Sequence, residues 1–164
     1  MSNLLQRTIL SAVLLCMGLP SFAQNLVPNP SFETLTQCPT GFQGICQGWA
    51  VSCSCPTLRT SDLYNVCSDP LTAVSVPRNS FGYQNARTGD GYAGILCKWP
   101  TPIREYLKVD LGAPLDAGQW YQVSFYVSLA NFTCGVEHIG AYFTSTDVYQ
   151  PTFNVLNFQP QVEA

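Results

Sequence analysis

Apolar and polar positions alternate along several stretches in the second half of the chain. The longest alternation covers residues 121–129, where Tyr, Val, Phe, Val and Leu take every second position, with Gln, Ser, Tyr and Ser between them. A period of two places these two sets on opposite faces of a β-strand. This run therefore predicts the clearest strand in the chain.

Shorter patterns predict further strands. Apolar side chains take every second position within residues 103–111 and again within 138–144, and residues 92–97 form an apolar run typical of a buried strand. Beyond residue 23, no stretch shows the 3.6-residue period of a helix. Several strands separated by turns favour an all-β protein with two packed sheets.

The region between the first apolar segment and these strands has a different character. Residues 34–80 are dense in Gly, Pro, Cys, Ser and Asn and show little periodicity. A long stretch of this composition predicts irregular structure that is functional or held by cross-links.

The first residues form an apolar leader. The apolar run of residues 9–19 follows Arg7 and is too short for the roughly 20 residues of a membrane-spanning helix. Ser21 and Ala23 are small residues at the positions that precede a cleavage site. We therefore predict a signal peptide over residues 1–23, an exported protein and one folded domain over residues 24–164; the alternative is a buried first helix.

Composition limits the class of partner. The chain has 7 basic and 10 acidic residues, a net charge of −3, and only 10% charged residues. A weakly acidic protein offers no electrostatic attraction to nucleic acid or anionic membranes. No run after the leader predicts a transmembrane helix. Aromatic residues make up 12% of the chain, which together with abundant Val, Thr and Ser favours strands and turns.

The cysteines predict a disulfide framework. The chain has eight, and removing Cys16 with the leader leaves an odd number in the exported domain. Zinc is the alternative, but Cys53 and Cys55 form a C-x-C pair, and no second pair or histidine follows at zinc-finger spacing. Spacing alone does not determine which cysteines pair or which one remains free.

Several segments are similar to one family in both order and spacing. Residues 25–33 (NLVPNPSFE), 87–93 (RTGDGYA) and 115–125 (LDAGQWYQVSF) resemble segments of jelly-roll carbohydrate-binding modules of the galactose-binding-like superfamily. A closer similarity, to the N-terminal domains of OmpA-like or gliding-associated surface proteins of Gram-negative bacteria, is carried by residues 48–49, 62–67, 76–84 and 104–107.

The resemblance implies a two-sheet jelly-roll sandwich with a disulfide between Cys38 and Cys67. Modules of this family close with further strands, so we expect the domain to be incomplete at its C-terminus and to belong to a longer polypeptide. An open sheet edge would then be exposed and prone to association. The implied location is the cell surface, the outer membrane or the extracellular space.

A calcium site is also implied by the resemblance. In similar jelly rolls, the Glu that closes the first segment and the Gly-containing turn help to bind a structural calcium ion, and the matching positions are Glu33, Gly89 and Asp90. Calcium prefers six to eight oxygen ligands. The alternative is that Glu33 caps a turn or pairs with an arginine.

Aromatic side chains are the candidate ligand contacts. Modules of this kind bind sugars by stacking flat rings on pyranose faces while nearby polar groups bond to the hydroxyls. The rings in or beside loops are Trp49, Tyr64, Tyr83, Trp99 and Tyr106. For Trp49 and Tyr64 the alternative is a role in packing.

Catalytic patterns are weak, so we predict that the protein is not an enzyme. His138 is the only histidine, no G-x-S-x-G motif is present, and the acidic residues are scattered. The predicted function is a non-catalytic binding or adhesion module with a glycan or another cell-surface polymer as ligand. The alternatives are a structural spacer or interaction domain of an outer-membrane or gliding-associated protein, and an accessory module of a polysaccharide hydrolase.

Overall fold

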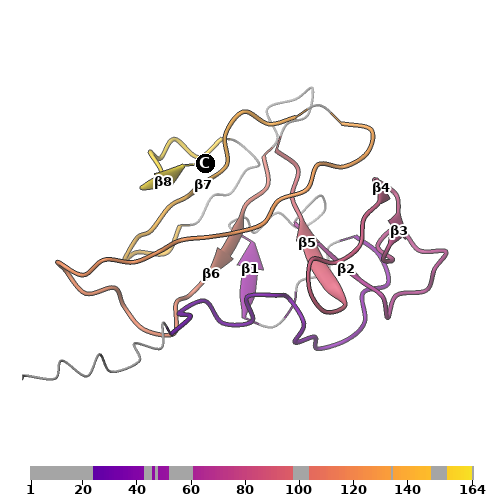
Figure 1. The fold of residues 1–164 in the computed structure, drawn as a ribbon, viewed down its shortest axis with the longest axis horizontal. Coiled ribbons are helices and arrows are strands. Elements are labelled where there is room, and N and C mark those ends of the chain that lie inside the picture. Colours follow the sequence, from indigo (N-terminus) through magenta and orange to yellow (C-terminus); the bar gives the residue numbers. More distant parts are fainter. Residues whose placement is uncertain are drawn as a thin grey trace, which may run out of the picture.

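A computed structural model of the chain describes residues 24–42, 46, 48–51, 61–97, 104–133, 135–148 and 155–163. Eight short strands and no helix occur within these ranges (Figure 1). The strands are β1 (Trp49–Val51), β2 (Asp62–Asn65), β3 (Arg78–Asn79), β4 (Gly82–Tyr83), β5 (Gly91–Gly94), β6 (Leu107–Val109), β7 (Gly140–Ala141) and β8 (Val162–Glu163). No helix in the described ranges has the length and apolar character needed to cross a membrane. The predicted signal peptide, residues 1–23, lies outside them.

The strands form four two-stranded antiparallel sheets, which pair β1 with β6, β2 with β5, β3 with β4, and β7 with β8. The first two pairings are nested, because β2 and β5 both lie between β1 and β6 in the sequence. Figure 1 shows the β1–β6 pair and the β2–β5 pair near the middle of the molecule. Segments far apart in the chain therefore meet in these two sheets.

The core is built on the β2–β5 sheet. Tyr64 lies opposite Tyr92 in the register, and their rings stack with centroids 5.0 Å apart and an interplanar angle of 13°. Val74 and Val76 complete the buried cluster around Tyr64, which is only 4% exposed. Gly94 leaves room for the Tyr64 ring, since a Cβ atom there would lie 2.7 Å from Cε2.

Burial determines the chemistry of these two hydroxyl groups. Burial, followed by the charge of Asp62, raises the pKa of Tyr64. Burial also raises the pKa of Tyr92, whose hydroxyl accepts a hydrogen bond of 2.7 Å from the side-chain amide of Asn79. Both tyrosines are therefore neutral core residues at ordinary pH.

The strand predictions are confirmed in part. β6 lies within residues 103–111, β7 lies within 138–144, and β5 begins one residue before the predicted 92–97 run. The described chain is thus rich in strands, as expected, but its strands form small sheets; two continuous packed sheets are not observed.

The strongest strand prediction is wrong for this structure. Residues 121–129 belong to no strand, and Figure 1 draws them as part of the plain trace between β6 and β7. Alternation shows that a segment suits a half-buried strand, but a sheet also needs a partner backbone to bond with. Within the described ranges, no partner strand is paired with this run.

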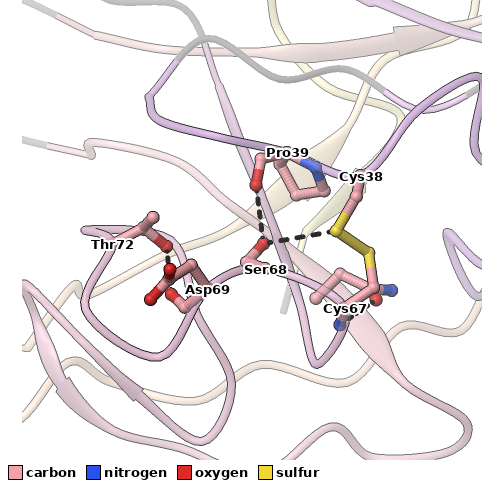
Figure 2. The surroundings of a disulfide bond; sticks show 7 residues. Cys38, Pro39, Cys67, Ser68, Asp69 and Thr72 are labelled. Carbon is pink, nitrogen blue, oxygen red and sulfur yellow. Dashed lines mark hydrogen bonds between the residues drawn. A yellow bond between two sulfur atoms is a disulfide. The ribbon is translucent and has the colours of Figure 1, made fainter.

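The disulfide implied by the resemblance is confirmed. Cys38 and Cys67 are bonded, with Cα atoms 5.8 Å apart (Figure 2). Beside the bridge, the buried Ser68 hydroxyl donates a hydrogen bond of 2.8 Å to the carbonyl of Pro39. The bridge therefore joins the irregular segment around residue 38 to the chain that leaves β2.

Two of the other cysteines, Cys46 and Cys97, are described and are free thiols. Desolvation by burial raises the pKa of both, so they are protonated at neutral pH and have little nucleophilic character. The remaining cysteines after residue 23, which are Cys53, Cys55 and Cys134, lie outside the described residues.

We expect loss of the bridge to destabilise the domain. Replacing both Cys38 and Cys67 by Ser reopens a loop with a sequence separation of 29, and a loop of this size corresponds to about 3 kcal/mol of unfolding free energy. Thermal denaturation should show a melting temperature lower by about 10 °C. Cys97→Ser is the matched control, and an unchanged melt in the double variant would contradict a structural role for the bridge.

Candidate functional site

The three predicted calcium-binding positions come together, and the contact is made by one carboxylate. The two oxygens of Glu33 accept hydrogen bonds from the backbone N–H of Asp90, at 3.1 and 3.0 Å. Glu33 Oε1 also accepts a bond of 3.1 Å from the N–H of Gly91. The side chain thus holds the turn that leads into β5.

The turn requires glycine at residue 89. Gly89 has a φ of +63°, and a Cβ atom there would lie 2.5 Å from the carboxyl carbon of Glu33. The left-handed backbone and the closeness of Glu33 both disfavour a side chain at this position. The sequence pattern TGDG therefore serves the approach of the carboxylate to the backbone.

The loop that presents Glu33 is also ordered by side chains. The Asn29 side chain donates a hydrogen bond to the Thr34 carbonyl at 3.1 Å and accepts one from the Thr34 N–H at 3.0 Å. The indole N–H of Trp49 donates a further hydrogen bond of 3.0 Å to the Asn29 carbonyl of this loop. These bonds orient the segment that carries Glu33.

This arrangement is a capped turn and fits a calcium ion poorly. Calcium requires several oxygens directed at one point, whereas residues 90 and 91 direct N–H groups, the positive ends of peptide dipoles, at the Glu33 carboxylate. No cluster of three or more His, Cys, Asp or Glu side chains that could hold a metal ion occurs in the described part of the chain. The geometry corresponds to the alternative in which Glu33 caps a turn.

Glu33→Gln should destabilise the domain by about 1–2 kcal/mol, because the amide offers one acceptor oxygen in place of two charged ones. We expect the melting temperature to fall by about 5 °C in thermal denaturation. Glu137→Gln, at an exposed carboxylate elsewhere in the chain, is the control for the change of charge. Equal melting temperatures for the two variants would rule out the cap.

Calcium should leave the stability unchanged. A ligand that binds only the folded state stabilises it and raises the melting temperature as the ligand concentration exceeds the Kd. On the geometry of the Glu33 cap, melts in 5 mM calcium chloride and in excess EDTA should therefore coincide. A calcium-dependent rise in the melting temperature that Glu33→Gln abolishes would contradict this expectation and restore the metal site.

One of the predicted sugar-stacking rings, Tyr64, is a packing residue, so its assignment as a ligand contact is corrected. It is buried in the core with its face against Tyr92, where burial of a large ring is favourable by itself. Trp49, in β1, is half-buried; its ring lies 4.8 Å from the Phe32 ring, and its N–H donates to the Asn29 carbonyl.

The other predicted rings lie in different surroundings. Tyr83, in β4, is 57% exposed, whereas Tyr106 is half-buried and its hydroxyl accepts a hydrogen bond of 3.0 Å from the N–H of Leu156. Trp99 lies outside the described residues. Four of the five predicted rings are described, and no ring–ring contact joins any two of these four. Of the four, Tyr83 is the ring that is mostly exposed.

Two exposed rings that sequence reasoning missed lie on the run after β6. Trp120 is 99% exposed and Tyr126 is 75% exposed. Their positions have the same parity as Gln122, Ser124 and Ser128, so an extended backbone places all five on one side. The sequence feature that indicates Tyr126 is its place among the polar positions of the alternation, and Trp120 comes directly before that run.

Two residues that follow β3 and β4, Gln84 and Arg87, contact Ser128 and Tyr126 on this side of the run. The guanidinium of Arg87 lies 4.1 Å from the centre of the Tyr126 ring, and the Ser128 hydroxyl donates a hydrogen bond of 2.5 Å to the Gln84 side chain. We call the resulting surface the aromatic-polar face; its members are Tyr83, Gln84, Arg87, Trp120, Gln122, Ser124, Tyr126 and Ser128.

Asn131 fixes the far end of the run to the β3–β4 turn. Its side-chain oxygen accepts a hydrogen bond of 2.8 Å from the Tyr83 N–H, and its own N–H donates to the Phe81 carbonyl at 3.1 Å. Gly82 makes this approach feasible, since a Cβ atom there would lie 2.1 Å from the Asn131 oxygen. The aromatic-polar face is thus held by side chains from both segments.

The aromatic-polar face has the chemistry of a sugar-binding surface. Exposed aromatic rings offer π-faces to the apolar C–H groups of a pyranose, while guanidinium, amide and hydroxyl groups bond to its hydroxyls. Trp120 and Tyr126 are at most about 20 Å apart along an extended chain. A ligand that contacts both would therefore be a chain of several sugar units.

A hollow near β1 is too small to be a ligand pocket. It has a volume of about 10 Å³, the size of one water molecule. Its lining includes Phe32, Cys46, Trp49, Ser61, Leu63 and Leu107. It is a packing gap under the capped turn.

His138 is the remaining candidate for chemistry. Its Nδ1 lies 3.8 Å from Glu163, and its side chain is exposed. This contact joins the approach to β7 with β8. It is a surface contact between an imidazole and a carboxylate, and contacts of this kind contribute at most about 1 kcal/mol.

No family model, curated protein or solved structure matches this chain. The resemblance described above therefore stays a hypothesis, and the functional argument depends on the geometry of the molecule.

Proposed function

We propose that residues 24–164 form an exported, non-catalytic binding module of the jelly-roll class at the cell surface, and that the aromatic-polar face binds a glycan. The single observation that carries this proposal is the exposure of two large rings, Trp120 and Tyr126, on one run of the chain, with the Arg87 guanidinium over the Tyr126 ring. Large exposed rings next to planar polar groups are typical of recognition surfaces.

The jelly-roll assignment is supported by the nested antiparallel pairings. β1 bonds to β6 and β2 bonds to β5, so early strands pair with late ones, as in two-sheet sandwiches with long connections. The alternation of residues 121–129 suits a further strand of such a sandwich. The Cys38–Cys67 bridge stabilises the irregular region that precedes it.

Arg87 gives the aromatic-polar face a preference for acidic ligands. Its guanidinium covers part of the Tyr126 ring, which positions five N–H donors beside an aromatic surface. Such a group can also bond to the carboxylates of acidic sugars, in bidentate fashion. We therefore expect uronic or other acidic polysaccharides to bind more tightly than neutral ones.

Glycan binding should depend on both rings. On an array of neutral and acidic glycans, the mature chain should bind a subset of the glycans. Titration calorimetry with the oligosaccharide that binds best should show an affinity reduced about 10-fold or more in Trp120→Ala and in Tyr126→Ala. Leu71→Ala, which removes a 95% exposed apolar side chain from another loop, is the control. Silence across the array, or full binding by both ring variants, would contradict the proposal.

A second candidate function is an interaction or spacer domain of an outer-membrane or gliding-associated protein. It is favoured by the exposed apolar side chains of the run after β6, including Val127 and Leu129. An apolar surface of this kind suits a protein partner. A role as an accessory module of a polysaccharide hydrolase would use the same glycan-binding face and differ only in what is attached to the domain.

A further inference from the structure

We propose that residues 121–129, which pair with no other segment in the described chain, form an antiparallel pair of strands with the same residues of a second copy. Within the described part of the chain, the backbone groups of residues 120–129 form no hydrogen bonds. An exposed extended segment with free N–H and C=O groups is a template for another strand. The proposal does not depend on glycan binding.

The charge distribution favours a second copy as the occupant. No charged residue occurs between Asp116 and Glu137, although the whole chain carries a net charge of −3. Two copies with the same net charge repel each other least where neither carries charge. Natural edge strands are usually protected by Lys or Pro, and residues 121–129 contain neither.

The alternation also specifies a register in which the segment complements itself. When two copies pair antiparallel about Phe125, Tyr121 lies opposite Leu129, and Val123 lies opposite Val127. Every apolar position then meets an apolar position on one face of the ribbon. Shifting either strand by one residue would place apolar side chains opposite polar ones.

The same register places the polar faces side by side. Tyr126 of each copy lies opposite Ser124 of the other, so the two Tyr126 rings approach each other across the two-fold axis. The aromatic-polar faces of both copies would then form one continuous surface. A long polymer that contacts both halves would gain avidity without any new contact.

Association should be measurable with the mature chain in solution. Light scattering coupled to gel filtration, over a concentration series from about 1 to 500 µM, should show a monomer that becomes a dimer. Val127→Lys places a cation in the centre of the ribbon, at a side chain that is 66% exposed and thus tolerant of change in the monomer. We expect it to weaken the dimer at least 10-fold without altering the melting temperature.

Phe132→Lys is the matched control, because it replaces another exposed apolar side chain, outside the run, with the same charge. It should dimerise like the parent. The register can be checked by placing the photo-crosslinking residue p-benzoylphenylalanine at position 125. Mass spectrometry should then find crosslinks to the segment around residue 125 of the other copy.

Each result of these experiments either supports or overturns the proposed pairing of two copies. A monomer at every concentration, an undiminished dimer in Val127→Lys, or crosslinks to another segment of the same or the other copy would each overturn the proposal. Amide exchange showing protected N–H groups in residues 121–129 of the monomer would mean that the chain itself occupies the edge, which also overturns it. A dimer together with a silent glycan array would support this inference while rejecting the proposed ligand.

Discussion

The stacking of Tyr64 on Tyr92 across the β2–β5 pair is the contact on which the described structure depends. It brings together segments about thirty residues apart, and the buried valines pack against it. One end of this sheet, where the last residue of β2 lies opposite the first residue of β5, is then secured by two different means. The Glu33 carboxylate caps the turn that enters β5, and the bridge to Cys67 anchors the chain that leaves β2.

The run after β6 is held in a different way from the core. Its contacts to the β3–β4 region use the side chains of Tyr126, Ser128 and Asn131 and the N–H of Asn131, while the backbone groups of residues 120–129 form no hydrogen bonds within the described part of the chain. Side-chain contacts of this kind fix a position while leaving rings and peptide groups accessible. The same run can therefore offer an aromatic-polar surface to a ligand on one side and a hydrogen-bonding edge to a second copy.

Sequence reasoning reached part of the fold and of the site. Alternation located β6 and β7, and the resemblance located the Cys38–Cys67 bridge and the meeting of Glu33 with the turn at residue 89. It assigned Tyr64 to the ligand surface, because an aromatic residue near Gly, Asn and Cys looks exposed when its cross-strand partner is not visible. It overlooked Trp120, because the residues next to this ring fit a strand pattern and only rings in or beside loops were taken as ligand contacts.

By itself, the sequence determined properties that depend on local order: strands and turns in place of helices, a low charge, and two faces of opposite character along residues 121–129. These follow from side-chain period and composition. Only the tertiary structure decided which ring is buried, which N–H groups Glu33 receives, and which strand finds a partner. Each of these depends on what another, distant segment presents at the same place, and no local pattern encodes that.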